Sequence, residues 1–297
     1  MYSVVMGFRE NYKHYGYTTL FSLLTNNKNS FFSIYLLSDN LDFAFFKKLE
    51  DVFACKIIPI SISADHIENV NCGYLSFGTL IRLLIGDYLP ANVEKVLYLD
   101  ADLIIDGDIH ELLNYELGSQ YAAVVRSSAP YKHLKDIRIT SEQYFNAGVI
   151  LFNMEMCRKD DIFIKSLDLL KRNNFKYLDQ DALNIAMVNN VKYVDSKWNF
   201  DSFRAKTILL DRSYANKYPA IAIYHFTGRD KPWFKHCINQ YQSIYLRYFA
   251  EILGYDVINN KNKFQYFKFK LIKFLFSNFV TRKIIYHLRN YIRTNIH

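Results

Sequence analysis

Two carboxylates stand directly after an apolar run at residues 96–99, which is typical of a buried strand. They are Asp100 and Asp102, and the small Ala101 separates them. Alternate side chains of a strand point to opposite faces, so both carboxylates can face one ion only where the strand ends and the chain bends. Such a pair forms half of an oxygen-ligand site for Mg²⁺ or Mn²⁺. The alternative interpretation is a solvated acidic loop that continues to Asp108.

A histidine follows a second apolar run, at residues 221–224. This is His225, and Gly228 and Lys231 come shortly after it. Imidazole beside carboxylates favours Mn²⁺ over Mg²⁺. A glycine lets the backbone approach a phosphate closely, and a lysine ammonium group neutralises pyrophosphate charge. The segment therefore predicts a contribution to a metal and diphosphate site, although a structural or surface role explains the histidine better when it is taken alone.

Two further polar groups stand where secondary structure elements are expected to begin. Asn146 enters a strand beside the small residues Ala147 and Gly148, and Asp179, Gln180 and Asp181 open a helix. For either aspartate alone, a helix cap is the simpler explanation. The Gln180 amide would still lie at the end of an element, which is where binding sites are commonly built.

These motifs need a scaffold that brings the ends of strands together. Apolar periodicity predicts strands at residues 4–6, 31–37, 56–60, 95–99, 121–125, 149–152 and 220–224, and helices at residues 14–25, 41–53, 76–89, 160–171 and 181–188. Alternating strands and helices predict an α/β fold, with a parallel-rich sheet and helices on both faces. In such sheets ligands bind beyond the carboxyl ends of the strands. The first two carboxylates fall at such an end.

Four ordered motifs resemble the family 8 glycosyltransferases, especially the bacterial lipopolysaccharide galactosyl- and glucosyltransferases. They are Val-Leu-Tyr-Leu-Asp-Ala-Asp ending at Asp102, Tyr-Phe-Asn-Ala-Gly-Val ending at Val149, Asp-Gln-Asp ending at Asp181, and His-x-x-Gly-x-x-Lys-Pro-Trp ending at Trp233. The resemblance covers roughly residues 1–250. It implies a GT-A fold, in which a Rossmann-like nucleotide-binding sheet continues into an acceptor-binding half. It also implies a retaining transferase that moves galactose or glucose from a UDP-sugar to a glycan acceptor, oligosaccharide or lipid-linked, in lipopolysaccharide, capsule or other surface-glycan synthesis.

The resemblance also implies roles for individual residues. Mn²⁺, with Mg²⁺ as the alternative, would be held by Asp100, Asp102 and His225. Tyr12 would stack on the base, and Arg82 would reach the donor sugar and phosphate. The residues implied at the nucleotide sugar are Gly7, Asn11, Tyr12, Arg82, Asp100, Ala101, Asp102, Gly228 and Lys231. The candidate catalytic residues are Asp179, which would bind donor-sugar hydroxyls, Gln180, which would lie near the anomeric carbon, Asp181 and Asn146.

Two positions depart from the family pattern. The family usually has an aspartate two residues before Asn11, placed to accept the uracil N3–H, and this chain has Arg9 there, which has no acceptor. Glu10 or the backbone is then the alternative acceptor. An aspartate that is common after the strand at residues 121–125 is Arg126 in this chain. Because that position faces the acceptor in similar enzymes, an anionic acceptor becomes a hypothesis.

The net charge of +8 gathers at one end of the chain. Residues 257–297 hold 9 Lys and Arg and no acidic residue, so the rest has 28 basic and 29 acidic residues, a net of −1. A nucleic-acid binder usually spreads its basic groups over the folded face, so no nucleic acid is expected as a partner. Basic and aromatic residues alternate in this tail, which predicts helices on an anionic membrane surface. A helix packed on the body is the alternative. We expect a catalytic domain at 1–256 and a membrane-attachment tail at 257–297.

The cysteines and the apolar segments bear on cellular location. The four cysteines show neither zinc-site spacing nor a disulfide framework, and no segment is typical of a signal peptide or a membrane span. We therefore expect a cytoplasmic protein, peripheral on the inner face of the cell membrane.

Two other functions fit the motifs: a catalytically silent nucleotide-sugar or glycan-binding module, and a nucleotidyltransferase. Donor turnover with Mn²⁺ tests the first, and release of pyrophosphate marks the second.

Overall fold

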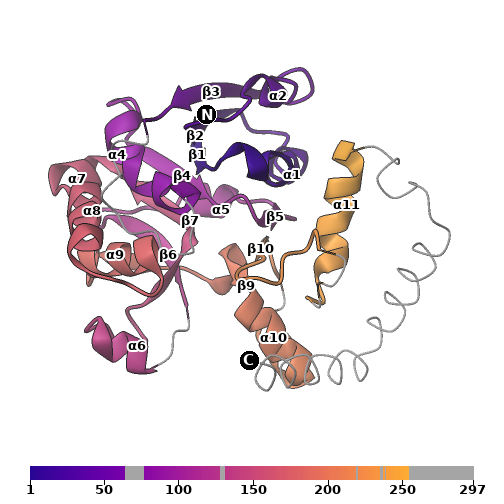
Figure 1. Ribbon diagram of the computed structural model, residues 1–297. Coiled ribbons are helices and arrows are strands. Elements are labelled where there is room, and N and C mark those ends of the chain that lie inside the picture. Colours follow the sequence, from indigo (N-terminus) through magenta and orange to yellow (C-terminus); the bar gives the residue numbers. More distant parts are fainter. Residues whose placement is uncertain (64–76, 128–130, 219, 235–236, 238, 254–297) are drawn as a thin grey trace.

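The computed structural model describes residues 1–63, 77–127, 131–218, 220–234, 237 and 239–253. Its centre is a seven-stranded sheet of order β3-β2-β1-β4-β7-β6-β8 (Figure 1). The strands are β1 (Tyr2–Gly7), β2 (Phe32–Ser38), β3 (Cys55–Ser61), β4 (Lys95–Leu99), β6 (Ala122–Arg126), β7 (Phe145–Asn153) and β8 (Val191–Tyr193). β7 runs antiparallel to both of its neighbours, and the other pairs of this sheet are parallel. The predicted parallel-rich α/β fold is thus confirmed.

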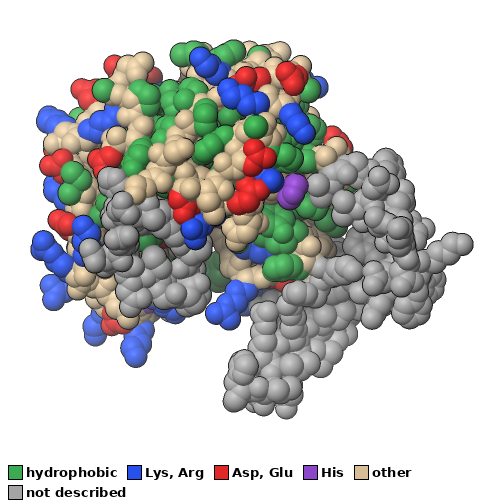
Figure 2. Space-filling model, turned by 45° about the horizontal axis from the view of Figure 1, so that its top comes forward, with side chains coloured by type: hydrophobic (Ala, Val, Ile, Leu, Met, Phe, Trp, Pro, Cys, Tyr) green, Lys and Arg blue, Asp and Glu red, His purple; other side chains and the backbone are tan. Residues whose placement is uncertain are grey.

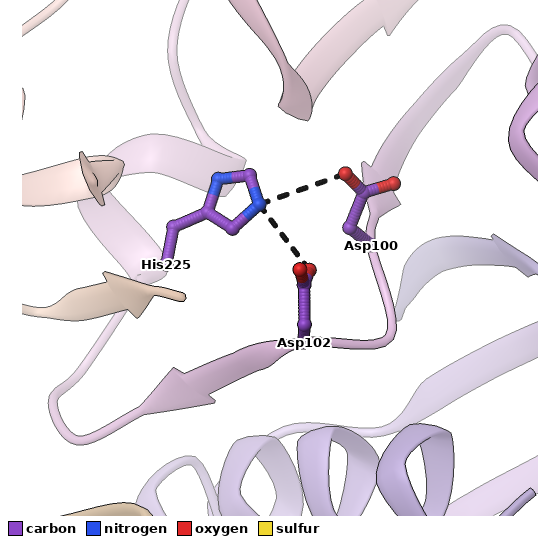
Figure 3. A group of neighbouring side chains, drawn as sticks. All are labelled: Asp100, Asp102 and His225. Carbon is purple, nitrogen blue, oxygen red and sulfur yellow. Dashed lines mark ion pairs between the residues drawn. The ribbon is translucent and has the colours of Figure 1, made fainter. Parts of the chain in front are cut away.

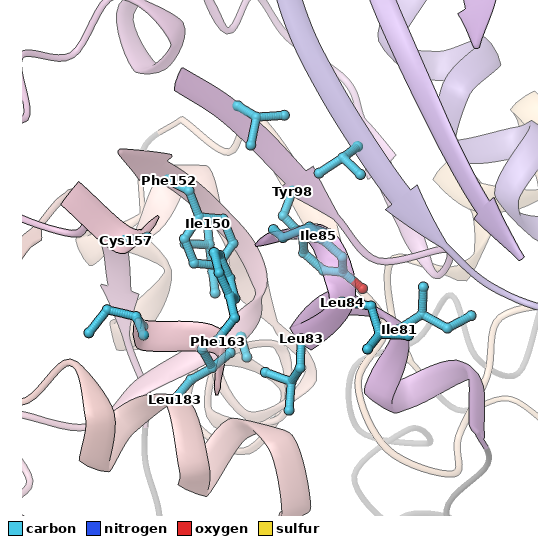
Figure 4. Packing of buried hydrophobic residues seen from close by; sticks show 14 of the residues in the cluster. Ile81, Leu83, Leu84, Ile85, Tyr98, Ile150, Phe152, Cys157, Phe163 and Leu183 are labelled. Carbon is cyan, nitrogen blue, oxygen red and sulfur yellow. The ribbon is translucent and has the colours of Figure 1, made fainter. Parts of the chain in front are cut away.

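Helices cover both faces of this sheet. α1 (Lys13–Asn26), α2 (Ala44–Lys47) and α5 (His110–Leu113) contribute to the apolar cluster on one face. The opposite face is covered by α4 (Ile85–Tyr88), α7 (Met154–Lys159), α8 (Ile162–Arg172) and α9 (Leu178–Ala186). There Tyr98 and Ile150 of the sheet pack among the helical side chains, and Phe152 contacts Phe163 with ring centroids 5.4 Å apart (Figure 4). The two cores hold the strand ends rigidly, which is what a site at those ends requires.

A second, three-stranded sheet brings distant motifs together. It has the order β5-β10-β9, with β5 (Leu103–Ile105), β10 (Ile223–His225) and β9 (Phe200–Asp201). β10 runs antiparallel to β5 and sets His225 opposite Leu103. Because Leu103 directly follows Asp102, this pairing carries the histidine to the end of β4.

The remaining helices are α3 (Phe77–Leu80), α6 (Tyr131–Asp136), α10 (Ser202–Leu210) and α11 (Gln242–Leu253). Within the described residues, no helix is long and apolar enough to cross a membrane. Figure 2 shows acidic and basic side chains interspersed on one face of the molecule, as the near-neutral charge of the body leads one to expect. The tail at 257–297, and the boundary expected after residue 256, lie outside the described residues.

Several predicted elements have different limits. The helix expected at 41–53 is wrong beyond α2, because turns follow it. The N–H groups of Leu49 and Glu50 donate to carbonyls three residues back, as in turns. The Glu50 carboxylate accepts the N–H of Ile57 in β3 (2.6 Å). Between α3 and α4, the helix expected at 76–89 tightens into a 3₁₀ turn (Ile81–Leu84) that carries Arg82; residue 76 is not described.

Three other limits shift along the chain. β7 is longer than the strand expected at 149–152, because it begins at Phe145 and pairs with both β4 and β6. The strand expected at 220–224 begins only at Ile223, where pairing with β5 starts. The helix expected at 181–188 begins earlier, at Leu178, because the Asp181 carboxylate accepts the N–H of Tyr177 at the helix start (2.9 Å).

Candidate active site

Asp100, Asp102 and His225 converge at the end of β4. The N–H of Asp100 still donates to the Gly148 carbonyl of β7 (2.9 Å), and the chain then turns at Ala101 and Asp102 before β5 begins. The His225 Nε2 lies 3.2 Å from Oδ1 of Asp102 and 3.6 Å from Oδ2 of Asp100 (Figure 3). One ligand atom from each of the three residues lies within 4.8 Å of the others. The buried Ala101 between the aspartates keeps the bend compact.

This group has the composition and the space of a metal site. Two carboxylates and one imidazole are ligands that suit Mn²⁺. Gly148 of the neighbouring β7 lies against them, and a Cβ at this position would overlap the His225 ring and approach Oδ2 of Asp100 to 2.7 Å. Glycine is therefore needed here for the space that the group occupies. These residues fit a divalent cation.

Arg82 connects the metal-ligand group to α9. Its guanidinium lies 2.8 Å from Oδ1 of Asp100 and 2.8 Å from Oδ2 of Asp179, and it donates to the Ala147 carbonyl. The Tyr98 hydroxyl also donates to Oδ1 of Asp100 (2.9 Å). Burial raises the pKa of Asp179 to about 7, against the opposing charge of Arg82. Arg82 and Asp179 thus lie together beside Asp100.

Lys231 approaches the same group from the segment after β10. Its ammonium group donates to the Asp102 carboxylate and to the Phe226 carbonyl (2.9 Å). Burial opposes ionisation of Asp102, but Lys231 and His225 outweigh it and hold the pKa of that carboxyl well below its usual value. Gly228 has φ of +79°, a conformation that favours glycine, and a side chain would meet no neighbour there. This turn places a cation next to the candidate metal ligands.

Gln180 and Asn146 face each other beside this centre. The Gln180 Oε1 accepts from Asn146 Nδ2 (3.2 Å) and from the N–H of Ala147 (3.1 Å). Asp181 points away from them into the interior. Its Oδ1 accepts from Tyr144 and from His133, and the Tyr177 bond makes it a helix-start acceptor, which is the structural alternative considered for it.

The residues assigned to the nucleotide lie at the end of β1 and in the turn that follows. Tyr12 is half-buried and stands edge-on to Trp233, with ring centroids 5.9 Å apart; burial raises its pKa. Asn11, in the 3₁₀ turn Glu10–Tyr12, is exposed. A Cβ on Gly7 would overlap Ile81, so the close contact between β1 and the Arg82 turn depends on this glycine. The structure therefore places Tyr12 beside the segment that carries Lys231.

Comparison with known proteins identifies the chain. The profile of glycosyl transferase family 8 matches residues 3–237. The chain belongs to this family. It is 28% identical to lipopolysaccharide 1,2-glucosyltransferase of Escherichia coli K12, covering 80% of this chain and 74% of that protein. It is also 28% identical to lipopolysaccharide 1,3-galactosyltransferase of Salmonella typhimurium, covering 78% and 73%.

A solved structure shows the same fold. The galactosyltransferase LgtC, in complex with donor and acceptor sugar analogues, superposes with a TM-score of 0.74 at 23% identity, covering 84% of this chain and 95% of that one. The protein is thus a glycosyltransferase with a GT-A fold. The four motifs from which the family was predicted all lie in the matched region.

The two departures from the family pattern have definite surroundings in this glycosyltransferase. Arg9 forms a two-bond ion pair with Asp39, at 3.1 and 2.5 Å. The Glu10 carboxylate accepts the N–H of Asp42 (2.9 Å) and pairs with Lys13. Both groups are engaged with the protein, so the hypothesis that Glu10 replaces the missing base acceptor gains no support.

Sequence reasoning missed three residues that shape the site. Tyr98 holds Asp100, Tyr144 joins Gln180 to Asp181, and Asn199 lies behind His225 with its Oδ1 2.9 Å from Nδ1 of the ring. Tyr98 stands between two leucines of a strand, and Tyr144 directly precedes one, so neither position gives a signal of a polar role. Asn199 sits between two aromatic residues without any recognisable pattern.

Proposed function

We propose that the protein is a Mn²⁺-dependent, retaining hexosyltransferase, which moves galactose or glucose from a UDP-sugar to a glycan acceptor in lipopolysaccharide or other surface-glycan synthesis. The convergence of Asp100, Asp102 and His225 next to Lys231 carries this proposal. Relatives named for lipopolysaccharide glucosyl and galactosyl transfer support the sugar and the product class.

In this proposal each residue has a distinct task. Asp100, Asp102 and His225 hold the cation, which when bound stabilises negative charge on the leaving diphosphate, an effect of several kcal/mol. Lys231 leaves Asp102 to pair with the same diphosphate as its charge grows. Arg82 and Asp179 orient the donor sugar, and Gln180 lies near the anomeric carbon.

The surroundings of Arg126 support the hypothesis of an anionic acceptor. The Arg126 guanidinium lies 4.3 Å from the centroid of the Tyr193 ring, donates to the Glu142 carbonyl (3.0 Å), and lies 3.7 Å from the exposed Glu142 carboxylate, which an anionic acceptor would replace. Half of its side chain, 52%, stays exposed. A fixed and accessible guanidinium suits recognition of a carboxylate or phosphate on the acceptor glycan.

The decisive experiment incubates the protein with Mn²⁺ and a panel of nucleotide sugars and measures slow donor hydrolysis. We expect UDP-galactose or UDP-glucose to be hydrolysed fastest, with release of UDP. Arg9 offers no acceptor to the uracil N3–H. Discrimination against other bases should therefore be about tenfold weaker than in an enzyme with an aspartate at this position, because about one hydrogen bond to uracil is missing. The Arg9→Asp variant should discriminate more strongly in favour of uracil, whereas Glu10→Gln should leave the base discrimination unchanged. Binding of UDP without any turnover would instead indicate a silent binding module.

We also propose that the tail attaches this glycosyltransferase to anionic membrane, as a peripheral protein on the inner face of the cell membrane. At about 1 kcal/mol for each basic residue near such a surface, half of its 9 basic residues would suffice for recruitment. A chain that ends at Asp256 should keep donor hydrolysis but lose binding to vesicles containing anionic lipid. Binding of the full chain should weaken as salt rises. Unfolding of the shortened chain, or a full chain that ignores anionic vesicles at low salt, would contradict the proposal.

A further inference from the structure

A chain of side-chain amides runs behind the candidate metal ligands, and its asparagines, Asn146 and Asn199, are buried. The backbone fixes the direction of each hydrogen bond in it, since a backbone N–H can only donate. The N–H of Gly148 donates to one end of the Asn146 side chain (2.9 Å), so that end is the oxygen. The N–H of Ala147 likewise fixes Oε1 of Gln180 (3.1 Å). The Asn146 nitrogen must then face the Gln180 oxygen, as it does at 3.2 Å.

The orientation of the Asn146 amide in turn fixes the hydrogen bonds between it and the histidine. The Asn146 oxygen lies 2.8 Å from the Asn199 side chain, so Asn199 presents its nitrogen there. The Asn199 oxygen consequently faces Nδ1 of His225 at 2.9 Å. An amide oxygen only accepts, so Nδ1 must carry the proton. In the neutral ring this leaves Nε2 with its lone pair, directed at the gap between Asp100 and Asp102.

The other end of the chain terminates on a buried anion. The Gln180 nitrogen donates to the Tyr144 hydroxyl (2.8 Å), and Tyr144 donates to Oδ1 of Asp181 (2.6 Å). Asp181 is 0% exposed and also accepts from His133 (2.9 Å). Every side-chain donor from His225 onwards therefore points toward Asp181, and such aligned bonds polarise one another.

We propose that Asn199 is a positioning residue, which holds the proton of His225 on Nδ1 and so keeps Nε2 available as a metal ligand. Asn146 keeps Asn199 in the required orientation, and through Gln180 it joins the metal ligand and the reaction centre in one network. Metal-bound histidines are commonly oriented by a partner on the second ring nitrogen, and loss of that partner weakens metal affinity by about 10–100-fold. The proposal rests on the proposed function for its link to metal, but not for the position of the proton.

The position of the proton is not an obvious consequence of the nearest charges. Two carboxylates near Nε2 would by themselves draw the ring proton to that nitrogen. Each already has a cation: Arg82 bonds Asp100 (2.8 Å), and Lys231 bonds Asp102. Within the part of the chain that the structure describes, His225 is the only hydrogen-bond donor to the Asn199 oxygen, so we expect the proton to stay on Nδ1.

Nuclear magnetic resonance of the metal-free protein tests this directly. Two-bond correlations between ring nitrogens and ring protons distinguish the two neutral tautomers, and His225→Gln identifies the signals of His225. At a mildly alkaline pH we expect the Nδ1–H form in the unmodified protein. Asn199→Leu should lose it. Asn27→Leu, at a buried asparagine bonded to Leu23 and Gly107 at the far end of α1, should lower the melting temperature without changing the tautomer.

A second variant separates hydrogen bonding from packing. Asn199→Asp keeps an acceptor toward Nδ1 and should retain the Nδ1–H form. Mn²⁺ binding, followed by electron paramagnetic resonance, should weaken at least tenfold in Asn199→Leu but not in Asn199→Asp. An Nε2–H form in the unmodified protein, or an unaltered tautomer in Asn199→Leu, would overturn the proposal. If the tautomer behaves as expected but no variant binds Mn²⁺, the proposed metal dependence fails while the role of Asn199 stands.

Discussion

Asp102→Asn should reduce Mn²⁺-dependent donor hydrolysis at least about 1,000-fold while the protein stays folded. The amide keeps one oxygen, which can still accept from Lys231, but its NH2 group replaces the second oxygen, and one of the two anionic ligands is lost. Weaker binding of the cation removes its transition-state stabilisation of several kcal/mol. Because each 1.36 kcal/mol corresponds to a factor of ten in rate, the loss amounts to about 1,000-fold or more. The measurement is a Mn²⁺ titration of UDP release, together with a melting curve to show that the fold persists.

Asp108→Asn is the matched control for this variant. Asp108 belongs to the same acidic segment, but its Oδ1 accepts from the N–H of His110 (2.7 Å) and from the ring of that residue (2.6 Å), away from the candidate metal ligands. Its substitution should leave both rate and Mn²⁺ dependence within about twofold. Equal Mn²⁺ dependence of Asp102→Asn and the unmodified protein would refute the assignment of the metal site.

The three predicted metal ligands share one property: they stand at the ends of strands. Asp100, Asp102 and His225 each follow or close an apolar run, and the geometry of sheets directs such ends to one place. No sequence pattern indicates that β10 pairs with β5 rather than extending the main sheet. That pairing, between segments more than a hundred residues apart, is what sets the histidine beside the aspartates.

Residues that position other side chains are not marked by any such pattern in the sequence. Asn199 and Tyr144 have polar atoms that matter because of partners brought by distant parts of the chain, and neither residue type nor local spacing reports those partners. Asp181 was identified, but its contacts lead away from the reaction centre: it accepts from Tyr144 and His133 in the interior. Its observed surroundings suit an anchor for Gln180 better than direct contact with substrate.

Gln180 therefore occupies the point where the interior network meets the proposed reaction centre. Three bonds fix its amide: the oxygen accepts from Asn146 and Ala147, and the nitrogen donates to Tyr144. Such a preorganised dipole needs no reorientation when charge develops nearby, and removal of one oriented group of this kind costs about 100-fold or more in kcat. We accordingly expect Gln180→Ala to lower kcat about 100-fold and to change the donor KM less than threefold.

Two further results should accompany this variant. The His225 tautomer and Mn²⁺ affinity should be retained, because the N–H of Gly148 still orients Asn146 when Gln180 is absent. Gln143→Ala, which removes a glutamine bonded to Thr140 and Asn189, should leave kcat within about twofold. Steady-state kinetics with saturating Mn²⁺ decides the matter. A Gln180→Ala variant with normal kcat and a raised donor KM would place Gln180 at the bound nucleotide sugar as a whole rather than at the reacting carbon.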